Sequence, residues 1–258
     1  MPLMPWPKAA SRRTGPRRPD DAARRGLGGV AILAVLAAPL TPVPAGAAGA
    51  PFRILAIGSS STQGTGASSP AMSYPAQLQS LFAAAYHGRA EVTVFNRGVA
   101  GEDIDEMVRR LGPAVAAAHP DLVVWQAGSN DPLRGVPMDR FEAELRDGIA
   151  TIRAEGAEVM LMEPQWSPVI ERADAKSRFV DAVRDVGAET HVEVVRRFAL
   201  MRDWVAQGLV SERDLIGPDR LHMTDRGYAL LARAVLDQIA ATSRTFRARL
   251  AVATARRP

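Results

Sequence analysis

The chain has 258 residues, a length that suits one domain with a sizeable hydrophobic core. It contains no cysteine, which excludes disulfide bonds, thiolate nucleophiles and cysteine-ligated metals. The formal net charge is +4, but residues 1–50 carry seven basic and two acidic side chains, so the rest of the chain sums to about −1. A basic nucleic-acid-binding surface on the folded domain is therefore not predicted.

Residues 1–48 have the layout of a secretory signal peptide. An arginine-rich stretch precedes the apolar run 27–40, and Ala45-Gly-Ala47 offers a cleavage site made of small residues. The apolar run is short for a bilayer span, so export to the periplasm or the medium is the first interpretation. The alternative is an uncleaved segment that anchors the protein to the membrane, or an unstructured leader.

From residue 51 onward, apolar runs of strand length alternate with helical patterns. Strands are predicted at 52–57, 91–95, 122–126, 158–162 and 191–195. Helices are predicted at 74–87, 102–111 with a further turn at 113–119, 138–155, 170–186 and 224–241, the last with Thr224 as its N-cap. This alternation predicts a parallel sheet with helices on both faces, and ligands that bind beyond the carboxyl ends of its strands. Residues 243–258 form a basic tail that is expected to fray.

The loop after the first predicted strand, Gly58-Ser-Ser-Ser-Thr62, is rich in small hydroxyl side chains. Phosphate binding is disfavoured, because residues 54–88 contain no charged side chain and no P-loop motif. A serine nucleophile would need a histidine oriented by a carboxylate. Of the four histidines, only His222 has a carboxylate, that of Asp219, at a workable spacing in its own segment. Taken alone, this pair also fits a structural turn.

Two other loops offer groups that could stabilise an oxyanion. Gly101 ends a glycine-containing loop, and Asn130 follows a buried strand with a side-chain amide. Each of them, taken singly, fits an ordinary turn equally well.

Together, these segments resemble the SGNH (GDSL-type) hydrolase superfamily, whose four sequence blocks occur here in order. The pattern is most similar to bacterial periplasmic arylesterases and thioesterase/lysophospholipase enzymes. The resemblance implies an α/β fold over residues 51–242, namely a flavodoxin-like three-layer sandwich with a five-stranded parallel sheet. It also implies that no cofactor or metal is needed. The blocks are Gly58–Thr62, Gly98–Glu102, Gly128–Asp131 and Asp219–His222.

The resemblance also implies a role for each matching residue. Ser60 would be the nucleophile, His222 the general base, and Asp219 the group that orients His222. The Ser60 amide, the Gly101 amide and the Asn130 side chain would form the oxyanion hole.

One position departs from the family pattern. The family usually has Gly-Asp-Ser in its first block, whereas Ser59 stands here in place of the aspartate. Because this position is not one of the catalytic triad, we expect activity to survive. Ser61 and Thr62 are expected to cap the helical turn that starts at the nucleophile.

The implied activity is hydrolysis of carboxylic esters, with a small-molecule or polysaccharide acyl ester as the substrate. Trp125, Met162, Trp166 and the loop 132–137 are candidates to line the cleft. Few aromatic residues and no long insertion favour short acyl groups, such as acetyl groups on polysaccharides or small aryl esters. Two alternatives stay open: acyl transfer to envelope glycans at the same site, and non-catalytic glycan binding on a hydrolase fold. The presence of all five implied site residues argues against the second.

Overall fold

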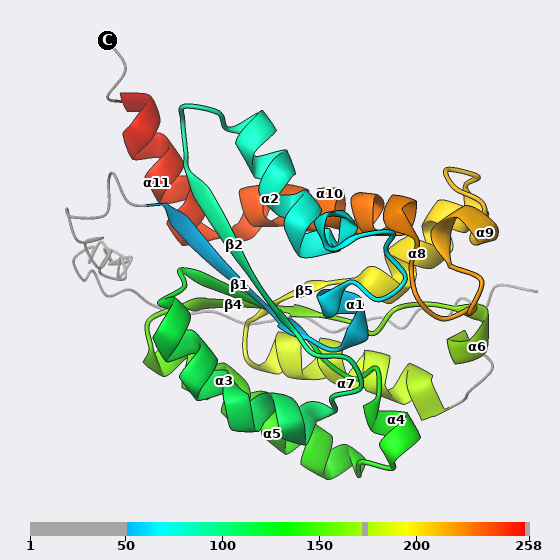
Figure 1. Ribbon diagram of the computed structural model, residues 1–258. Coiled ribbons are helices and arrows are strands. Elements are labelled where there is room, and N and C mark those ends of the chain that lie inside the picture. The colour runs from blue at the N-terminus through cyan, green and yellow to red at the C-terminus, as the bar shows by residue number, and fades with distance from the viewer. Residues whose placement is uncertain (1–50, 172–174, 256–258) are drawn as a thin grey trace, which may run out of the picture. The chain divides into compact units, whose positions relative to one another are not determined.

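The computed structural model describes residues 51–171 and 175–255, so the predicted export segment lies outside the described residues (Figure 1). Five parallel strands form one sheet in the order β2-β1-β3-β4-β5. This confirms the predicted α/β fold with a five-stranded parallel sheet. The strands are β1 (Phe52–Gly58), β2 (Val92–Gly98), β3 (Leu122–Gln126), β4 (Glu158–Met162) and β5 (Glu193–Val195).

Helices cover both faces of the sheet, as Figure 1 shows. Successive residues of a strand point to opposite faces, so Ile54 of β1 joins one hydrophobic cluster and Leu55 joins the other. The helices that supply the first cluster are α2 (Tyr74–Ala85), α8 (Arg197–Ala206), α9 (Glu212–Leu215), α10 (Asp225–Thr242) and α11 (Arg244–Ala255). Those that supply the second are α3 (Ile104–Ala118), α5 (Met138–Ala154) and α7 (Ala175–Glu189).

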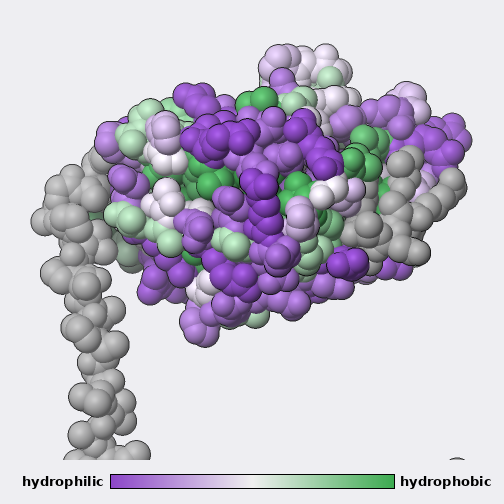
Figure 2. All heavy atoms as spheres, turned by 90° about the horizontal axis from the view of Figure 1, so that it is seen from below, coloured by the Kyte–Doolittle hydropathy of each residue, from purple (hydrophilic) through white to green (hydrophobic). Residues whose placement is uncertain are grey.

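Helix α3 is continuous, so the expected interruption near Pro113 is wrong. Asp103 and Glu106 form a capping box that starts the helix. Pro113 lies on the exposed side, where water can solvate the carbonyl group that the missing N–H leaves free. Seen from the side of α3 and α5, the surface is mainly hydrophilic with small, separate apolar areas (Figure 2). This agrees with helices that bury one face and expose the other.

The segment after residue 243 does not fray through residue 255, contrary to the expectation. It forms α11, whose Phe246 is fully buried with ring centroids 5.2 Å from Phe52 and 5.3 Å from Phe82. Arg249 pairs with Asp121 and donates a hydrogen bond of 3.2 Å to the carbonyl of residue 51. Aromatic packing and this ion pair hold the helix on the domain.

The other helical predictions differ in detail. Thr224 is the N-cap of α10, as predicted, and accepts a hydrogen bond from the Gly227 amide at 3.2 Å. Helix α7 begins at Ala175 rather than at residue 170, after the single turn α6 (Pro168–Glu171). Helices α8 and α9 were not predicted. Within residues 51–171 and 175–255, no helix is both long enough and apolar enough to cross a bilayer.

Candidate active site

The predicted motifs converge at the carboxyl edge of the sheet. Ser60 begins the short helix α1 (Ser60–Gln63) directly after β1. The motif 98–102 starts at the last residue of β2, the loop 128–131 follows β3, and the turn that carries His222 precedes α10. Because parallel strands end at the same edge, segments that are far apart in sequence meet there.

The structure brings together three residues that the sequence motifs named, because Ser60, His222 and Asp219 form a hydrogen-bonded line. The Ser60 Oγ lies 3.0 Å from His222 Nε2, and His222 Nδ1 lies 2.6 Å from Asp219 Oδ2. The turn is closed by a hydrogen bond of 2.7 Å from the Gly217 amide to the His222 carbonyl. The imidazole is therefore fixed at both ring nitrogens, which is the geometry of an activated serine.

The carboxylate of Asp219 is stabilised in its charged form. Partial burial raises its pKa, but hydrogen bonds from the Leu221 amide, the His222 ring and the His222 amide outweigh that effect, and the net pKa is lowered. The hydrogen bonds from the two backbone amides both measure 3.0 Å and are accepted by Asp219 Oδ1. Asp219 is thus ionised at neutral pH and able to stabilise a protonated imidazole.

The three predicted oxyanion-hole donors differ in whether they already have a hydrogen-bond partner. Within residues 51–171 and 175–255, the amides of Ser60 and Gly101 have no hydrogen-bond acceptor, so both remain available to a ligand. Gly101 has a φ of +85°, a conformation that favours glycine. The Asn130 side chain donates a hydrogen bond of 2.8 Å to the Glu102 carbonyl, which orients its amide.

Gln63 holds the loop after β2 against α1. Its Oε1 accepts a hydrogen bond of 2.9 Å from the Ala100 amide, and its own carbonyl accepts one of 3.3 Å from the Asn96 side chain. A Cβ at Gly98 would lie 2.0 Å from the Gln63 nitrogen, so only glycine allows this approach. These hydrogen bonds hold the loop that contains Gly101 beside the helix that carries Ser60. Sequence patterns did not identify Gln63.

Gln126, the last residue of β3, contacts α1, and the sequence patterns did not identify it either. Its Oε1 accepts hydrogen bonds from the Ser59 amide at 2.9 Å, the Ser59 hydroxyl at 3.1 Å and the Ser61 hydroxyl at 3.2 Å. Thr62 Oγ1 lies 3.4 Å away. The expected capping role of Ser61 and Thr62 is therefore wrong, because both lie inside α1 and point to Gln126. The only sequence signal for Gln126 is that a polar residue ends an otherwise apolar strand.

Next to Asn130, the buried carboxyl of Asp131 connects the third motif to α3. Its Oδ1 accepts a hydrogen bond of 2.8 Å from the Ile104 amide at the start of that helix. Burial raises the pKa of Asp131 to about 6. The position of Asn130 is thus linked to the amino end of α3 through its neighbour.

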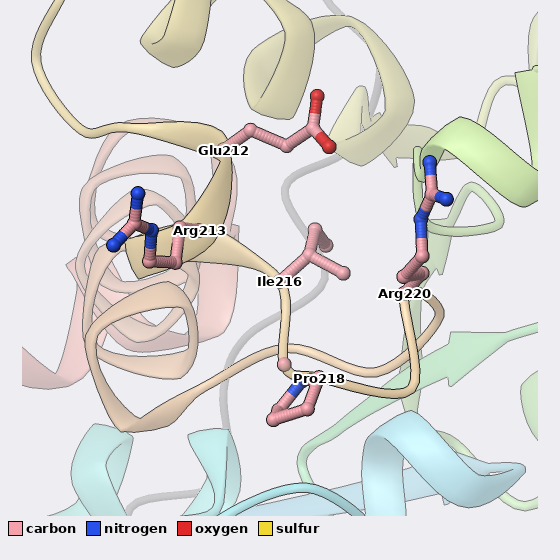
Figure 3. A pocket seen from close by; sticks show the side chains of 6 residues that line it. Glu212, Arg213, Ile216, Pro218 and Arg220 are labelled. Carbon is pink, nitrogen blue, oxygen red and sulfur yellow. The ribbon is translucent and has the colours of Figure 1, made fainter.

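Three of the residues expected to line the cleft lie in the core instead. Trp125 and Met162 are fully buried, and Trp166 is nearly so. A pocket of about 340 Å³ lies beside the turn that carries Asp219 and His222, with Arg213 and Arg220 on its two sides and Ile216 between them (Figure 3).

The chain was compared with known proteins. The profile of the family described as Non-GDSL lipase-like matches residues 31–245. An arylesterase from Vibrio mimicus is 34% identical over 82 residues, which are 32% of this chain and 40% of that protein. Esterase TesA from Pseudomonas aeruginosa is 35% identical over 75 residues, 29% of this chain and 37% of that protein. The aligned part thus spans about two fifths of these relatives.

Solved structures show the same fold over a larger share. The lipase/acylhydrolase from Enterococcus faecalis has a TM-score of 0.62 and 26% identity, covering 73% of this chain and 95% of that one. An acetylxylan esterase from Geobacillus stearothermophilus has a TM-score of 0.62 and 24% identity, covering 73% and 94%. The crystal structure of TesA has a TM-score of 0.61 and 23% identity, covering 72% and 97%.

Proposed function

Because this chain belongs to the Non-GDSL lipase-like family, we propose that it hydrolyses carboxylic esters with Ser60 as the nucleophile. The observation that carries the proposal is the line from Ser60 Oγ to His222 Nε2 at 3.0 Å and from His222 Nδ1 to Asp219 Oδ2 at 2.6 Å. The family name agrees with the sequence, since Ser59 stands where a GDSL motif has its aspartate.

In the proposed cycle, Ser60 attacks the ester carbonyl while His222 takes the hydroxyl proton. The ionised Asp219 stabilises the imidazolium, and His222 then gives the proton to the departing alcohol. A water molecule, deprotonated by His222, attacks the resulting acyl-enzyme, and the acid leaves as Ser60 regains its proton. Acylation and deacylation each end with His222 neutral again, so the cycle needs no other proton carrier.

The negative charge that develops on the carbonyl oxygen needs donors that are already in place. The unpaired amides of Ser60 and Gly101 support this role, and the Asn130 amide is held by the Glu102 carbonyl. Removing the Asn130 side-chain donor should therefore lower kcat by about 100- to 1,000-fold.

For the substrate, we favour short acyl groups, such as acetyl groups on polysaccharides or small aryl esters. Charged side chains line both the pocket beside the turn 217–222 and a second pocket near Gly66 and Asp225, and neither pocket is lined by Ser60 or His222. Neither of them therefore offers an apolar channel for a long acyl chain at the nucleophile. This suits a small acyl group better than a long chain. The arginine-rich and apolar segment 1–48 supports export, which would give the enzyme access to esters outside the cytoplasm.

The test is turnover of p-nitrophenyl acetate by the full chain and by Ser60→Ala and His222→Ala. Loss of the nucleophile should lower kcat by at least about 10,000-fold. His191→Asn is the matched control, because His191 is exposed in the turn before β5 and its φ of +53° is one that asparagine tolerates. Wild-type activity in Ser60→Ala would overturn the proposal.

A panel of p-nitrophenyl esters from acetate to palmitate, together with acetylated xylan, tests the acyl preference. A kcat/KM that rises toward palmitate would contradict the short-chain assignment. Product analysis with an acceptor sugar distinguishes hydrolysis from acyl transfer, because transfer would move the acyl group to the sugar instead of releasing acid.

A further inference from the structure

Arg197 is a buried charge that the proposed mechanism does not use. It begins α8 and is the only arginine among residues 51–171 and 175–255 whose side chain is wholly buried. Burial lowers the pKa of its guanidinium to about 10, which leaves it cationic at neutral pH. Because an uncompensated buried cation is unfavourable, the contacts of Arg197 must explain its presence.

All three guanidinium nitrogens donate to uncharged oxygens. Nη1 donates to the Ser61 hydroxyl at 2.8 Å, Nε to the Glu163 backbone carbonyl at 2.9 Å, and Nη2 to Gln165 Oε1 at 3.2 Å. The Glu163 carboxylate accepts instead from two other arginines. In the described part of the chain, Arg197 therefore has no carboxylate within ion-pair distance, and its shortest contact is with Ser61.

Ser61 connects Arg197 to Gln126, which contacts the residue before the nucleophile. Because its oxygen accepts from Arg197, its proton is free to bind Gln126 Oε1, which lies 3.2 Å away. The same oxygen of Gln126 accepts from the Ser59 amide and hydroxyl. A path of hydrogen bonds thus runs from Arg197 through Ser61 and Gln126 to the backbone amide of Ser59, the residue directly before Ser60. The first two bonds run head to tail, from the guanidinium to the Ser61 hydroxyl and from that hydroxyl to Gln126, so they polarise one another.

Helix α1 needs this support. It has only four residues, and its N-cap, Ser59, makes no side-chain capping bond. A helix of this length does not form without external contacts. The 3.0 Å contact between Ser60 Oγ and His222 Nε2 therefore depends on what holds α1 in place. A displacement of about 1 Å at a reacting group lowers a rate by about 100-fold.

We propose that Arg197 is a positioning residue for Ser60 and acts through Ser61 and Gln126. This inference rests on the proposed function, because it takes Ser60 as the nucleophile. With Ser59 in place of the usual aspartate, the first motif carries no charge of its own. The guanidinium is the charged group that is hydrogen-bonded to α1.

The experiment is a double-mutant cycle on the full chain, with Arg197→Met, Ser61→Ala and the double variant. Arg249→Met and Ser243→Ala are matched controls, since they remove a partly buried arginine and a buried serine at the opposite end of the sheet. Two quantities are measured: kcat and KM with p-nitrophenyl acetate, and the rate at which a p-nitrophenyl alkylphosphonate labels Ser60. Peptide mass spectrometry identifies the labelled serine.

Both single variants should lower kcat and the labelling rate by about 10- to 100-fold, with KM changed by less than about threefold. The double variant should be no slower than the slower single variant, because both residues act in one chain. The controls should unfold more easily but keep kcat within about twofold of wild type. A purely structural contribution of Arg197 would instead lower stability without this split between kcat and KM.

Multiplicative losses in the double variant, or wild-type kcat and labelling in a folded Ser61→Ala, would overturn the inference. If Arg197→Met does not fold, Ser61→Ala decides by the same criterion. Ser60→Ala separates this inference from the proposed function. If that variant stays active, the proposed function itself fails; if it is inactive, the cycle alone decides the role of Arg197.

Discussion

Replacing Gln126 by methionine tests whether the buried amide supports the nucleophile helix. Methionine is similar in length and apolar, so Gln126→Met removes one acceptor without opening a large cavity. The Ser59 amide, at 2.9 Å, cannot rotate to another partner, whereas the Ser61 hydroxyl can. The Ser129 hydroxyl also loses the hydrogen bond that Gln126 Nε2 donates at 2.9 Å.

The magnitude follows from these bonds. A buried polar group left without a partner costs about 1–3 kcal/mol, and one amide plus partly compensated hydroxyls sum to about 3–5 kcal/mol. For a domain of this size, 1 kcal/mol shifts the melting temperature by about 2–4 °C. Gln126→Met should thus lower Tm by about 6–20 °C.

The assay is urea unfolding followed by tryptophan fluorescence, together with thermal melting followed by circular dichroism. Gln126→Glu, measured at about pH 4 so that the buried carboxyl group is neutral, is the control: its carbonyl oxygen accepts from the same donors and its hydroxyl can replace the donor to Ser129. It should lose less than about half as much stability as the methionine variant. A loss below about 1 kcal/mol in Gln126→Met, or an equal loss in both variants, would refute the reasoning.

Two other substitutions test the supports of the site. Burial raises the pKa of Asp131 from 3.8 to about 6, so the stability that this group contributes is complete below pH 3.8 and is lost as the pH rises toward 6. Asp131→Asn should remove this pH-dependent loss of stability, which is about 3 kcal/mol. The prediction is contradicted if wild type and variant differ in unfolding free energy by the same amount from about pH 4 to pH 7. Gly98→Ala places a Cβ 2.0 Å from the Gln63 nitrogen and should cost about 1–3 kcal/mol and lower kcat. Gly112→Ala, where a Cβ meets only an ordinary contact of 3.8 Å, should be neutral or stabilising in thermal melts, and equal behaviour of the two variants would argue against the tight packing at Gly98.

The fold could be predicted well where local pattern and burial agree. The central strands, such as β3, are buried along their whole length and appear in the sequence as short apolar runs. Helix α11 was not predicted as part of the fold, because its arginines suggested a solvated tail. Its attachment depends on one aromatic residue, Phe246, whose partners lie far away in sequence. Local composition contains no information on such a contact.

The candidate site divides in the same way. Ser60, His222 and Asp219 could be named because the family motifs contain them, and the structure brings them into hydrogen-bond contact. Gln126 and Arg197 could not, because they lie 65 and 136 residues from Ser61 and belong to no motif. Residues that support a reactive group through tertiary contacts can be identified only once the three-dimensional packing is known.

The contacts of α11 bear on the order in which the domain can form during synthesis. Phe246 packs on Phe52, and Arg249 binds the carbonyl of residue 51, so the last described helix covers the beginning of β1. β1 lies in the middle of the sheet, between β2 and β3. Since a chain is made from its amino end, Phe52 at the start of this strand lacks its Phe246 partner until residues 244–255 have emerged. A nascent chain would therefore expose this part of the core until α11 has been made, and a truncation before residue 244 would leave it exposed permanently.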